Sequence, residues 1–504
     1  MTAPARFDTT AGRYRRLSLG LALTALLALT LADIDWVNSS PWFELGRIGW
    51  GMLTPDFFGV ESLASAVANT LAFALLGVAV ANVTGFIFAL LFRWRLVQLF
   101  CALIRAVHEL FWALLFLQLF GLGTLTGLLA IAIPYTGIFA RVYAEILEEA
   151  DQRPAELVPV GSGWLSTFAY ARIPPAFAHL KNYALYRLEC GIRSSAVLGF
   201  IGLPTLGFHL ETSFSQGLYS QAAALLYLFF ALIASIRLWV RPWLIPLYLA
   251  MALYWLPFDG YWSVATLQQF LGYDIVPAPL RDAGVQALAE PRLWWPWLQN
   301  LLLQQALPGI VNTLVLSIIA MVACGILTLL LFPLVSTLFM PRQGRSTGHL
   351  LLVVLRSIPE LILAFIILLV TGPSMLPAII ALALHNGAII AHLIGRYSDA
   401  LLLRDDASRG INRYLFEVLP RIYPQFLAFL LYRWEVIMRE TAILGILGIH
   451  TLGFFIDSAF EELRFDRALL LILMTALVNM ALDQLARALR RRLQLDANPQ
   501  QARY

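Results

Sequence analysis

Two closely similar stretches place arginines and a glutamate ahead of an apolar run that is rich in glycine. LYRLECGIRSSAVLGFIGLPTLGFHL at residues 185–210 returns as LYRWEVIMRETAILGILGIHTLGFFI at residues 431–456, with 13 identities in 26 positions. Arginines in such a place attract anions, and glycines let a helix break or approach its neighbour closely. The shared residues include Tyr186, Arg187, Glu189, Arg193, Gly199, Gly202 and Gly207, with partners Tyr432, Arg433, Glu435, Arg439, Gly445, Gly448 and Gly453.

The charged residues of these stretches have two interpretations that the sequence leaves open. Glu189 lies four residues before Arg193, and Glu435 lies four before Arg439, so each pair can neutralise itself on one face of a helix near the cytoplasmic interface. The alternative gives the arginines a direct part in handling an anionic solute. With both interpretations open, we count Arg193 and Arg439 as candidates for the solute pathway. The residues that we count as candidates for structural ion pairs are Arg187, Glu189, Arg433 and Glu435.

The glycines also have two interpretations. They either allow close helix packing, or let one helix break within the membrane and aim backbone groups at a pathway. Pro204 favours a break in the first copy more than His450 does in the second. The glycines that we count as pathway candidates are Gly199, Gly202, Gly207, Gly445, Gly448 and Gly453.

A second group of charges falls inside or at the edge of strongly apolar segments. Arg105-Ala-Val-His108-Glu109 of the first half matches Arg356-Ser-Ile-Pro-Glu360 of the second. An ionised side chain at the centre of a spanning helix costs about 2.5–3.5 kcal/mol, so such residues normally face a bundle interior. We expect either an Arg/Glu pair one helical turn apart that fixes packing, or a lining of the solute route. Weaker candidates are His385 and His392.

The composition shows which elements must position these residues. The 504 residues are 60% hydrophobic and 13% charged, with a mean hydropathy of +0.75, whereas soluble domains are about 25% charged. A span needs roughly 20 apolar residues, and such runs recur throughout. We expect an all-α polytopic membrane protein with about twelve spans, at 17–34, 66–92, 98–120, 124–146, 183–210, 218–238, 242–258, 307–333, 349–371, 375–395, 429–456 and 467–486.

The spans form a tandem repeat of two six-helix units, residues 1–240 and 241–504. Because each unit has an even number of spans, the two keep the same membrane orientation and can be related by a two-fold axis along the membrane normal. Arginines cluster in every second connection, so both termini are expected in the cytoplasm, with an uncleaved first helix. The Trp-rich segment 259–300 is expected outside, where WWPW at 294–297 suits the interface.

The same pattern excludes several functions. The net charge of +4 comes from arginines between spans and indicates no nucleic-acid partner. Cys101, Cys190 and Cys324 lack metal-ligand spacing. The chain has no P-loop, no H-E-x-x-H and no C-x-x-C, so we expect no enzyme and no cofactor on this chain, and any energy must come from another protein.

Long basic connections follow the fourth span of each half. YAEILEEADQRPAELVPVGSGWLSTFAYARIPPAF and GRYSDALLLRDDASRGINRYLFEVLPRIYPQF both mix apolar and charged residues with helical spacing and end near prolines. The pattern is typical of a short amphipathic helix that lies outside the membrane. We expect a partner to grip this helix in both halves, the alternative being an interfacial helix without a partner.

At this point the residues resemble a known family. The LYRxExxxRxxxxLGxxGxxxxGF block and the loop before it are similar to the permeases of phosphonate ABC importers (PhnE type), of the binding-protein-dependent inner-membrane permease superfamily, over roughly 60–240 and 300–490. The resemblance implies two cytoplasmic ATPase subunits that bind ATP, and a periplasmic substrate-binding protein. It assigns to the ATPase-coupling loops Glu145, Glu149, Gly161, Pro174, Arg404, Ala407 and Pro420, and puts the LYR-block residues on a helix that borders the pathway.

Two departures from the family pattern indicate unequal ATPase contacts. Ala407 stands where the family usually has Gly, and the second loop is shorter, with 24 positions from Arg396 to Pro420 against 33 from Arg141 to Pro174. A fused tandem is itself unusual, since most members are homodimers of one unit.

We predict the permease of an importer for phosphonate or a related phosphorus oxyanion, which works by alternating access in the bacterial inner membrane. One alternative is an importer for an amino acid or another small nutrient. Another is a proton-coupled secondary transporter, with His108, Glu109 and Glu360 as its relay. An intramembrane enzyme is disfavoured because the sequence has no recognisable nucleophile or metal set.

Overall fold

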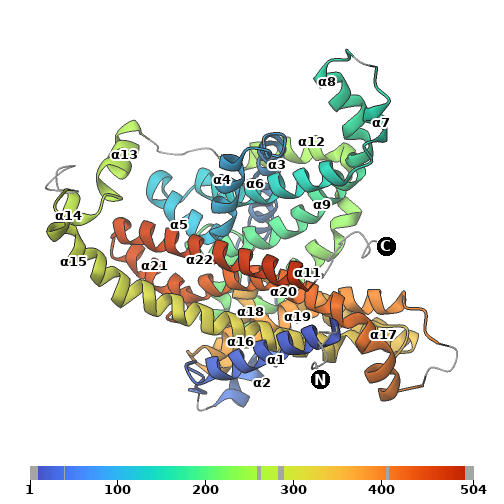
Figure 1. Cartoon of the computed structure of the whole chain (residues 1–504). Coiled ribbons are helices and arrows are strands. Elements are labelled where there is room, and N and C mark those ends of the chain that lie inside the picture. Colours follow the sequence, from blue (N-terminus) through green and yellow to red (C-terminus); the bar gives the residue numbers. More distant parts are fainter. Residues whose placement is uncertain are drawn as a thin grey trace, which may run out of the picture. The chain divides into compact units, whose positions relative to one another are not determined.

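The computed structural model describes residues 10–38, 40–159, 161–257, 263–281, 289–404 and 408–493. Over these ranges every regular element is a helix and none is a strand, which confirms the predicted all-α class (Figure 1). So apolar a sequence is expected to form helices in a membrane, because a helix satisfies the hydrogen bonds of its backbone N–H and C=O groups within one segment.

Six described helices are long and apolar enough to cross a bilayer. Three lie in the first half of the chain and three in the second, as the repeat predicts. They are α3 (Leu63–Leu90), α6 (Thr124–Glu149), Tyr219–Ile236 of α11 (Tyr219–Trp239), the continuous helix Pro291–Val335, α19 (Leu376–Asp399) and α22 (Phe465–Arg492).

Four further pairs of described helices pass the same test only together, because each pair is bent at a short break. Counting each pair as one span gives up to ten spans. The pairs are α4 (Arg95–Ala106) with α5 (Glu109–Phe120), bent by 90°; Trp164–Ile201 with α10 (Leu206–Ser215), by 52°; α17 (Arg342–Ser357) with α18 (Glu360–Thr371), by 95°; and Arg413–Leu447 with α21 (Leu452–Glu461), by 45°.

The two other predicted spans correspond to α1 (Thr10–Leu29) and to a shorter apolar helix, Pro242–Trp255, which includes α12 (Ile245–Trp255). α1 begins with three arginines in its first two turns, and the second helix is shorter than a typical span. The multi-pass class is therefore confirmed, and the count of twelve stays a prediction.

The predicted spans 98–120 and 349–371 are each bent, since each is an elbow of two helices that meet at about a right angle. Val107 and His108 have extended backbone between α4 and α5. Ile358 is extended between α17 and α18, because the proline that follows it disfavours the helical conformation. Each elbow places an acidic residue, Glu109 or Glu360, in the first turn of the next helix, where the helix dipole favours it.

The helix Pro291–Val335 also begins earlier than predicted. It joins α15 (Pro291–Leu301), the π turn η6 (Leu302–Ala306), α16 (Leu307–Leu331) and the 3₁₀ turn η7 (Phe332–Val335) without a break. The π turn lies just before Pro308, a residue that cannot donate a helical hydrogen bond. The WWPW run is therefore helical and continuous with a span.

Packing divides the described residues into two compact units. The first unit contains residues 46–276, and the second contains residues 10–45 and 277–493. Within the first unit α12 packs on α3, and within the second α1 packs on α16. The division at residue 240 follows the sequence repeat, whereas packing assigns the first helix of each half to the unit that holds most of the other half.

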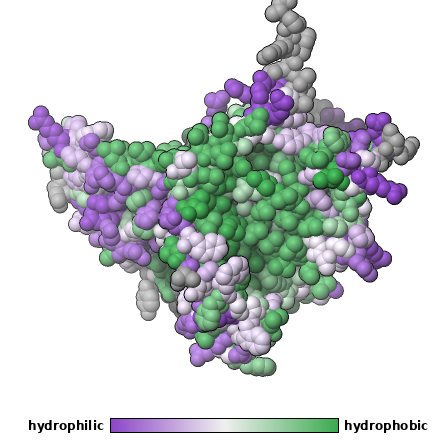
Figure 2. Space-filling model, turned by 90° about the horizontal axis from the view of Figure 1, so that it is seen from below, coloured by the Kyte–Doolittle hydropathy of each residue, from purple (hydrophilic) through white to green (hydrophobic). Residues whose placement is uncertain are grey.

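Apolar side chains gather on the surface as well as in the core. Figure 2 shows a broad hydrophobic area bordered by hydrophilic residues. Large apolar side chains of α1 such as Leu23 and Leu26 are about 60% exposed. For a chain whose solvent is lipid, such a surface is the outside of the bundle.

Candidate functional site

The duplicated LYR stretch folds into a broken helix in both units. In the first, α9 (Ile173–Val197) runs into the 3₁₀ turn η2 (Leu198–Ile201) and ends at Gly202, whose φ is +92°. In the second, α20 (Leu419–Ile443) and the 3₁₀ turn η9 (Leu444–Leu447) end at Gly448, whose φ is +83°. Positive φ favours glycine. Both copies therefore break, although only the first has the proline.

The other glycines of the stretch allow the chain to fold back on itself. A Cβ added to Gly199 would lie 2.0 Å from Phe208 N, and one added to Gly207 would lie 1.7 Å from Ala196 O. A Cβ on Gly445 would lie 2.1 Å from Phe454 N. The close-packing and helix-break interpretations are thus both realised in one motif.

An Asn-Thr pair on another helix holds each break. In the first unit Asn69 Nδ2 of α3 donates to Pro204 O at 2.8 Å, and Leu206 N donates to Thr70 Oγ1 at 2.8 Å. The second unit repeats these contacts: Asn312 Nδ2 of α16 donates to His450 O at 2.8 Å, and Leu452 N donates to Thr313 Oγ1 at 3.0 Å. Sequence reasoning did not select these four residues, although Asn69-Thr70 and Asn312-Thr313 match in the repeat.

In the first unit a polar cluster surrounds Glu109 at the elbow. His108 caps α5, since its Nδ1 accepts from Leu110 N at 3.2 Å, and its Nε2 lies 3.5 Å from Glu109 Oε2. Ser194 Oγ of α9 donates to Glu109 Oε1 at 2.6 Å. The same hydroxyl lies 3.0 Å from that of Tyr135 in α6. The cluster therefore joins α5, α6 and α9.

The second unit has a corresponding cluster around Glu360. His385 Nε2 of α19 lies 2.7 Å from Glu360 Oε1. Asn386 Nδ2 donates to Glu440 Oε2 of α20 at 2.9 Å, and Arg433 Nε donates to Asn386 Oδ1. Glu440 also faces the carboxyl of Glu360. His385 and Asn386 are fully buried, so this cluster joins α18, α19 and α20 inside the unit.

The two clusters occupy matching positions with different chemistry. The register that aligns Arg105 with Arg356 also aligns Tyr135 with Asn386, and the register of the LYR block aligns Ser194 with Glu440. The first unit thus uses hydroxyl groups where the second uses an amide and a carboxyl. Neither Tyr135 nor Asn386 was a candidate from sequence, because neither is charged and both lie far along the chain from their partners.

Arg105 and Glu109 do not lie one turn apart on a single helix, which was one of the two arrangements expected from sequence. Arg105 is in the last turn of α4 and Glu109 is in the first turn of α5, on the other side of the elbow. Arg356 and Glu360 are separated in the same way, by the elbow between α17 and α18.

Two arginines of the first LYR stretch have hydrogen-bond acceptors on their own helix. Arg193 Nη2 donates to Cys190 Sγ at 3.3 Å, and the predicted pair of Arg193 with Glu189 stays a prediction. Arg187 Nε donates to Tyr183 Oη at 2.8 Å. Its guanidinium also lies 5.3, 5.5 and 5.6 Å from the ring centroids of Tyr183, Tyr135 and Tyr186. Aromatic faces attract a guanidinium in this way, so Arg187 belongs to the first polar cluster, as Arg433 belongs to the second.

The predicted coupling loops are only partly helical. The first contains the one-turn helix α7 (Arg153–Glu156), and α8 (Trp164–Thr167) and the π turn η1 (Phe168–Arg172) then run without a break into α9. The amphipathic helix expected in this loop stays a prediction. In the second loop the π turn η8 (Arg413–Val418) leads directly into α20.

The predicted loop residues have diverse surroundings. Arg141 Nε donates to Glu145 Oε1 at 3.0 Å within α6, Glu149 ends α6, and Gly161 has a φ of +103°. The others lie near helix ends, or, for Ala407, outside the described residues: Pro174 in the first turn of α9, Arg404 after α19, and Pro420 in the first turn of α20.

Both loops carry exposed apolar side chains. In the first loop, Leu157, Leu165 and Tyr170 are 83%, 69% and 85% exposed. In the second, Leu402, Ile411 and Phe416 are 91%, 72% and 74% exposed. Exposed apolar groups at matching places in two repeats are typical of a docking surface for a partner.

These features define a polytopic α-helical membrane protein built from two like bundles, each with an elbow, a broken helix and a buried polar cluster. The chain is 27% identical over 426 residues to the phosphate-import permease protein PhnE of Mycolicibacterium smegmatis. These aligned residues are 79% of this chain and 77% of that protein. It is 27% identical over 228 residues to the phosphite transport system permease protein PtxC of Stutzerimonas stutzeri, which covers 43% of this chain and 82% of that protein.

A third relative is the putative cryptic phosphonate transport system permease protein PhnE2 of Escherichia coli. It is 29% identical over 102 residues, which are 20% of this chain and 84% of that protein. These relatives confirm the predicted resemblance to the PhnE-type permeases. No protein-family model and no solved structure matches the chain.

Proposed function

We propose that the chain is the membrane-spanning permease of an ATP-driven importer for phosphorus oxyanions. The observation that carries this proposal is the likeness over 79% of the chain to a phosphate-import permease. Two further relatives carry the words phosphite and phosphonate in their names, so the shared solute class is a tetrahedral phosphorus oxyanion. An importer for an amino acid or another nutrient is not favoured.

The partners in this proposal are two ATPase subunits on the cytoplasmic side and a substrate-binding protein outside. Both chain termini lie in the cytoplasm of a bacterial cell, and the bilayer is the inner membrane. The ATPases grip the two loops at 141–174 and 396–420, and ATP binds to them rather than to this chain. The support is the exposed apolar side chains of both loops, among them Tyr170 and Phe416.

The polar clusters give the loops a mechanical connection to the membrane interior. Each predicted coupling loop leads into a broken helix, α9 or α20. Ser194 of α9 is bonded to Glu109 of α5, and Glu440 of α20 is bonded to Asn386 of α19. A shift of a loop is therefore transmitted to the elbow helix in the first unit and to α19 in the second. Alternating access needs coupled movements of this kind.

Reconstitution tests the proposal. The permease is placed in proteoliposomes with its ATPase subunits and its binding protein, which genes beside its own are expected to encode. Uptake of radiolabelled phosphate, phosphite and methylphosphonate is then measured with ATP. We expect uptake of at least one of these anions that needs both ATP and the binding protein, with no uptake of glutamate. Uptake driven by a pH gradient without ATP would instead support a secondary transporter.

A further inference from the structure

A pocket lies beside the first coupling loop, entirely within the first unit. Its volume is about 790 Å³, within the range of roughly 300–1,000 Å³ that is typical of ligand sites. Its walls come from the end of α3, the turn before α4, the end of α6, and the segment from α8 to η1. No residue of the two polar clusters described above lines this pocket.

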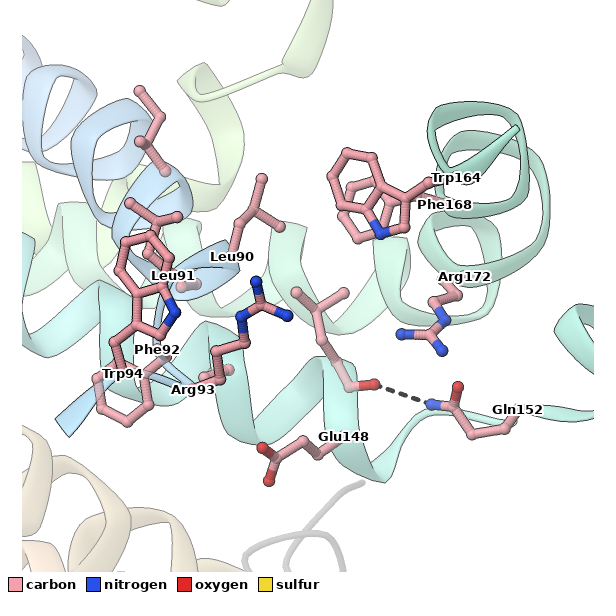
Figure 3. Close-up of a pocket in the computed structure, with 14 residues that line it drawn as sticks. Leu90, Leu91, Phe92, Arg93, Trp94, Glu148, Gln152, Trp164, Phe168 and Arg172 are labelled. Carbon is pink, nitrogen blue, oxygen red and sulfur yellow. Dashed lines mark hydrogen bonds between the residues drawn. The ribbon is translucent and has the colours of Figure 1, made fainter. Parts of the chain in front are cut away.

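Two arginines face this pocket. Figure 3 shows the guanidinium groups of Arg93 and Arg172 on opposite sides of the same space, with the rings of Trp164 and Phe168 above Arg172 and the ring of Trp94 beyond Arg93. Neither arginine forms an ion pair with a described residue. Glu148 also lines the pocket, so the formal charge of the lining is +1.

The matching residues of the second unit make different contacts. There Tyr414, which aligns with Phe168, stacks on Phe332 at 5.5 Å between ring centroids, and its hydroxyl donates to Leu329 O at 3.0 Å. Asp399, which aligns with Glu148, accepts from Thr337 N at 2.6 Å. The position of Arg172 is taken by the buried Val418. The fold therefore does not require an arginine at the position of Arg172, where the second unit has valine.

An apolar track leads from the pocket along α3. Val80, Val83 and Ile87 are 39%, 60% and 52% exposed, and their spacing puts them on one face of the helix. Ile87 and Leu90 line the pocket itself. A ligand with a charged head and an apolar tail would meet arginines at one end of this surface and hydrocarbon-facing side chains along the rest.

We infer that this pocket binds the phosphoryl head group of an acidic phospholipid. Arginine recognises phosphate oxygens through paired N–H donors, and basic pockets at the cytoplasmic side of spanning helices are known to hold acidic head groups. The acyl chain lies along Val83 and Ile87. The bound head group bridges the turn after α3 to η1, and so braces the first coupling loop against the membrane.

Native mass spectrometry of the full chain in detergent tests this inference. Delipidated protein is titrated with dioleoyl phosphatidylglycerol and, separately, with dioleoyl phosphatidylcholine. The test variant is R93Q/R172V, in which valine is the residue of the second unit. The matched control is R153Q, which removes one exposed arginine of the same loop, 88% exposed. A second variant, R93K/R172K, keeps both charges.

We expect the first phosphatidylglycerol to bind roughly 30-fold more weakly to R93Q/R172V, with phosphatidylcholine binding unchanged, R153Q unaffected and R93K/R172K intermediate. An equal size-exclusion profile checks that the variants are folded. Equal phosphatidylglycerol binding by wild type and R93Q/R172V overturns the inference.

Two other results also overturn the lipid assignment. In one, inorganic phosphate stabilises the wild type but not R93Q/R172V, and the double substitution changes the binding of neither phospholipid. The anion that the pocket binds is then free phosphate. In the other, the double substitution changes only the retention of ATPase subunits, so that the pocket is part of their docking surface.

Discussion

Ser194 Oγ donates to Glu109 Oε1 at 2.6 Å, and this bond ties the broken helix α9 to the first turn of α5. The substitution S194A leaves the half-buried carboxylate without this donor. A hydrogen bond to a charged group contributes about 1.5–3 kcal/mol, so we expect a loss of thermal stability of that order in detergent, together with slower uptake. The control S215A breaks a similar bond to Glu211 at an exposed site, and a change as large there would contradict the argument.

Replacing Thr70 by valine removes the buried acceptor for Leu206 N at the start of α10. An unsatisfied buried donor costs about 1–3 kcal/mol. T70V and T313V should be equally harmful because Thr313 accepts from Leu452 N in the second unit. Thermal denaturation followed by size exclusion measures both. T24V, at an exposed hydroxyl of α1, should have no effect, and a harmless T70V would show that the break does not depend on this bond.

A methyl group at Gly199 should prevent correct folding of the first broken helix. Its Cβ would lie 2.0 Å from Phe208 N, which the backbone can relieve only by separating α10 from η2. Overpacking typically costs about 1–3 kcal/mol, and we expect at least the upper end here because the clash is with backbone, which cannot move aside as a flexible side chain can. The measurement is the yield of monodisperse G199A protein. G163A, where a Cβ meets no atom within 4 Å, should express normally.

Exposed apolar residues of the coupling loops should be needed for ATPase binding but not for folding. We expect L165S/Y170S to reduce retention of the ATPase subunits at least about 30-fold, as for a binding hot spot, with an unchanged melting temperature. F416S should also reduce retention of the ATPase subunits, but by a different factor, because the second loop is shorter. V264S, at another exposed apolar residue, in α13 (Val264–Gln269), should retain the ATPase subunits fully. If L165S/Y170S and F416S retain the ATPase subunits as fully as V264S does, the loops are not part of the docking surface.

Glu440 should tolerate an amide far better than a truncation. In E440Q the side chain still accepts from Asn386 Nδ2, whereas E440A removes this buried acceptor from the network in which Asn386 also accepts from Arg433 Nε. Breaking a buried charged network costs about 3–5 kcal/mol. We expect E440A to lose stability of this order and E440Q to lose much less, as read from thermal denaturation. E462A, which breaks an exposed pair with Arg464, is the control, and equal losses for E440A and E440Q would indicate that the acidic group itself is required.

Composition was enough to predict the helical class, and the internal repeat offered the broken helix as one of two interpretations of its glycines. The elbows were not predictable in the same way, because only Pro359 marks one, and the equivalent break at His108 has no breaking residue. For the polar clusters, the sequence indicated the acidic residues at the elbows but not their hydroxyl and amide partners. Glu109 and Glu360 are conspicuous in apolar sequence, but Tyr135 and Asn386 become partners only through packing between helices 50 or more residues apart in the chain.

The uninterrupted helix from Pro291 to Val335 has a geometric consequence. At about 1.5 Å per residue, its 45 residues reach roughly 68 Å, more than twice the ~30 Å thickness of a hydrocarbon core. An untilted helix of that length stands well clear of one face of the bilayer. The tryptophans at 294, 295 and 297 lie near one end of this helix, so the helix carries them beyond the hydrocarbon core on that side.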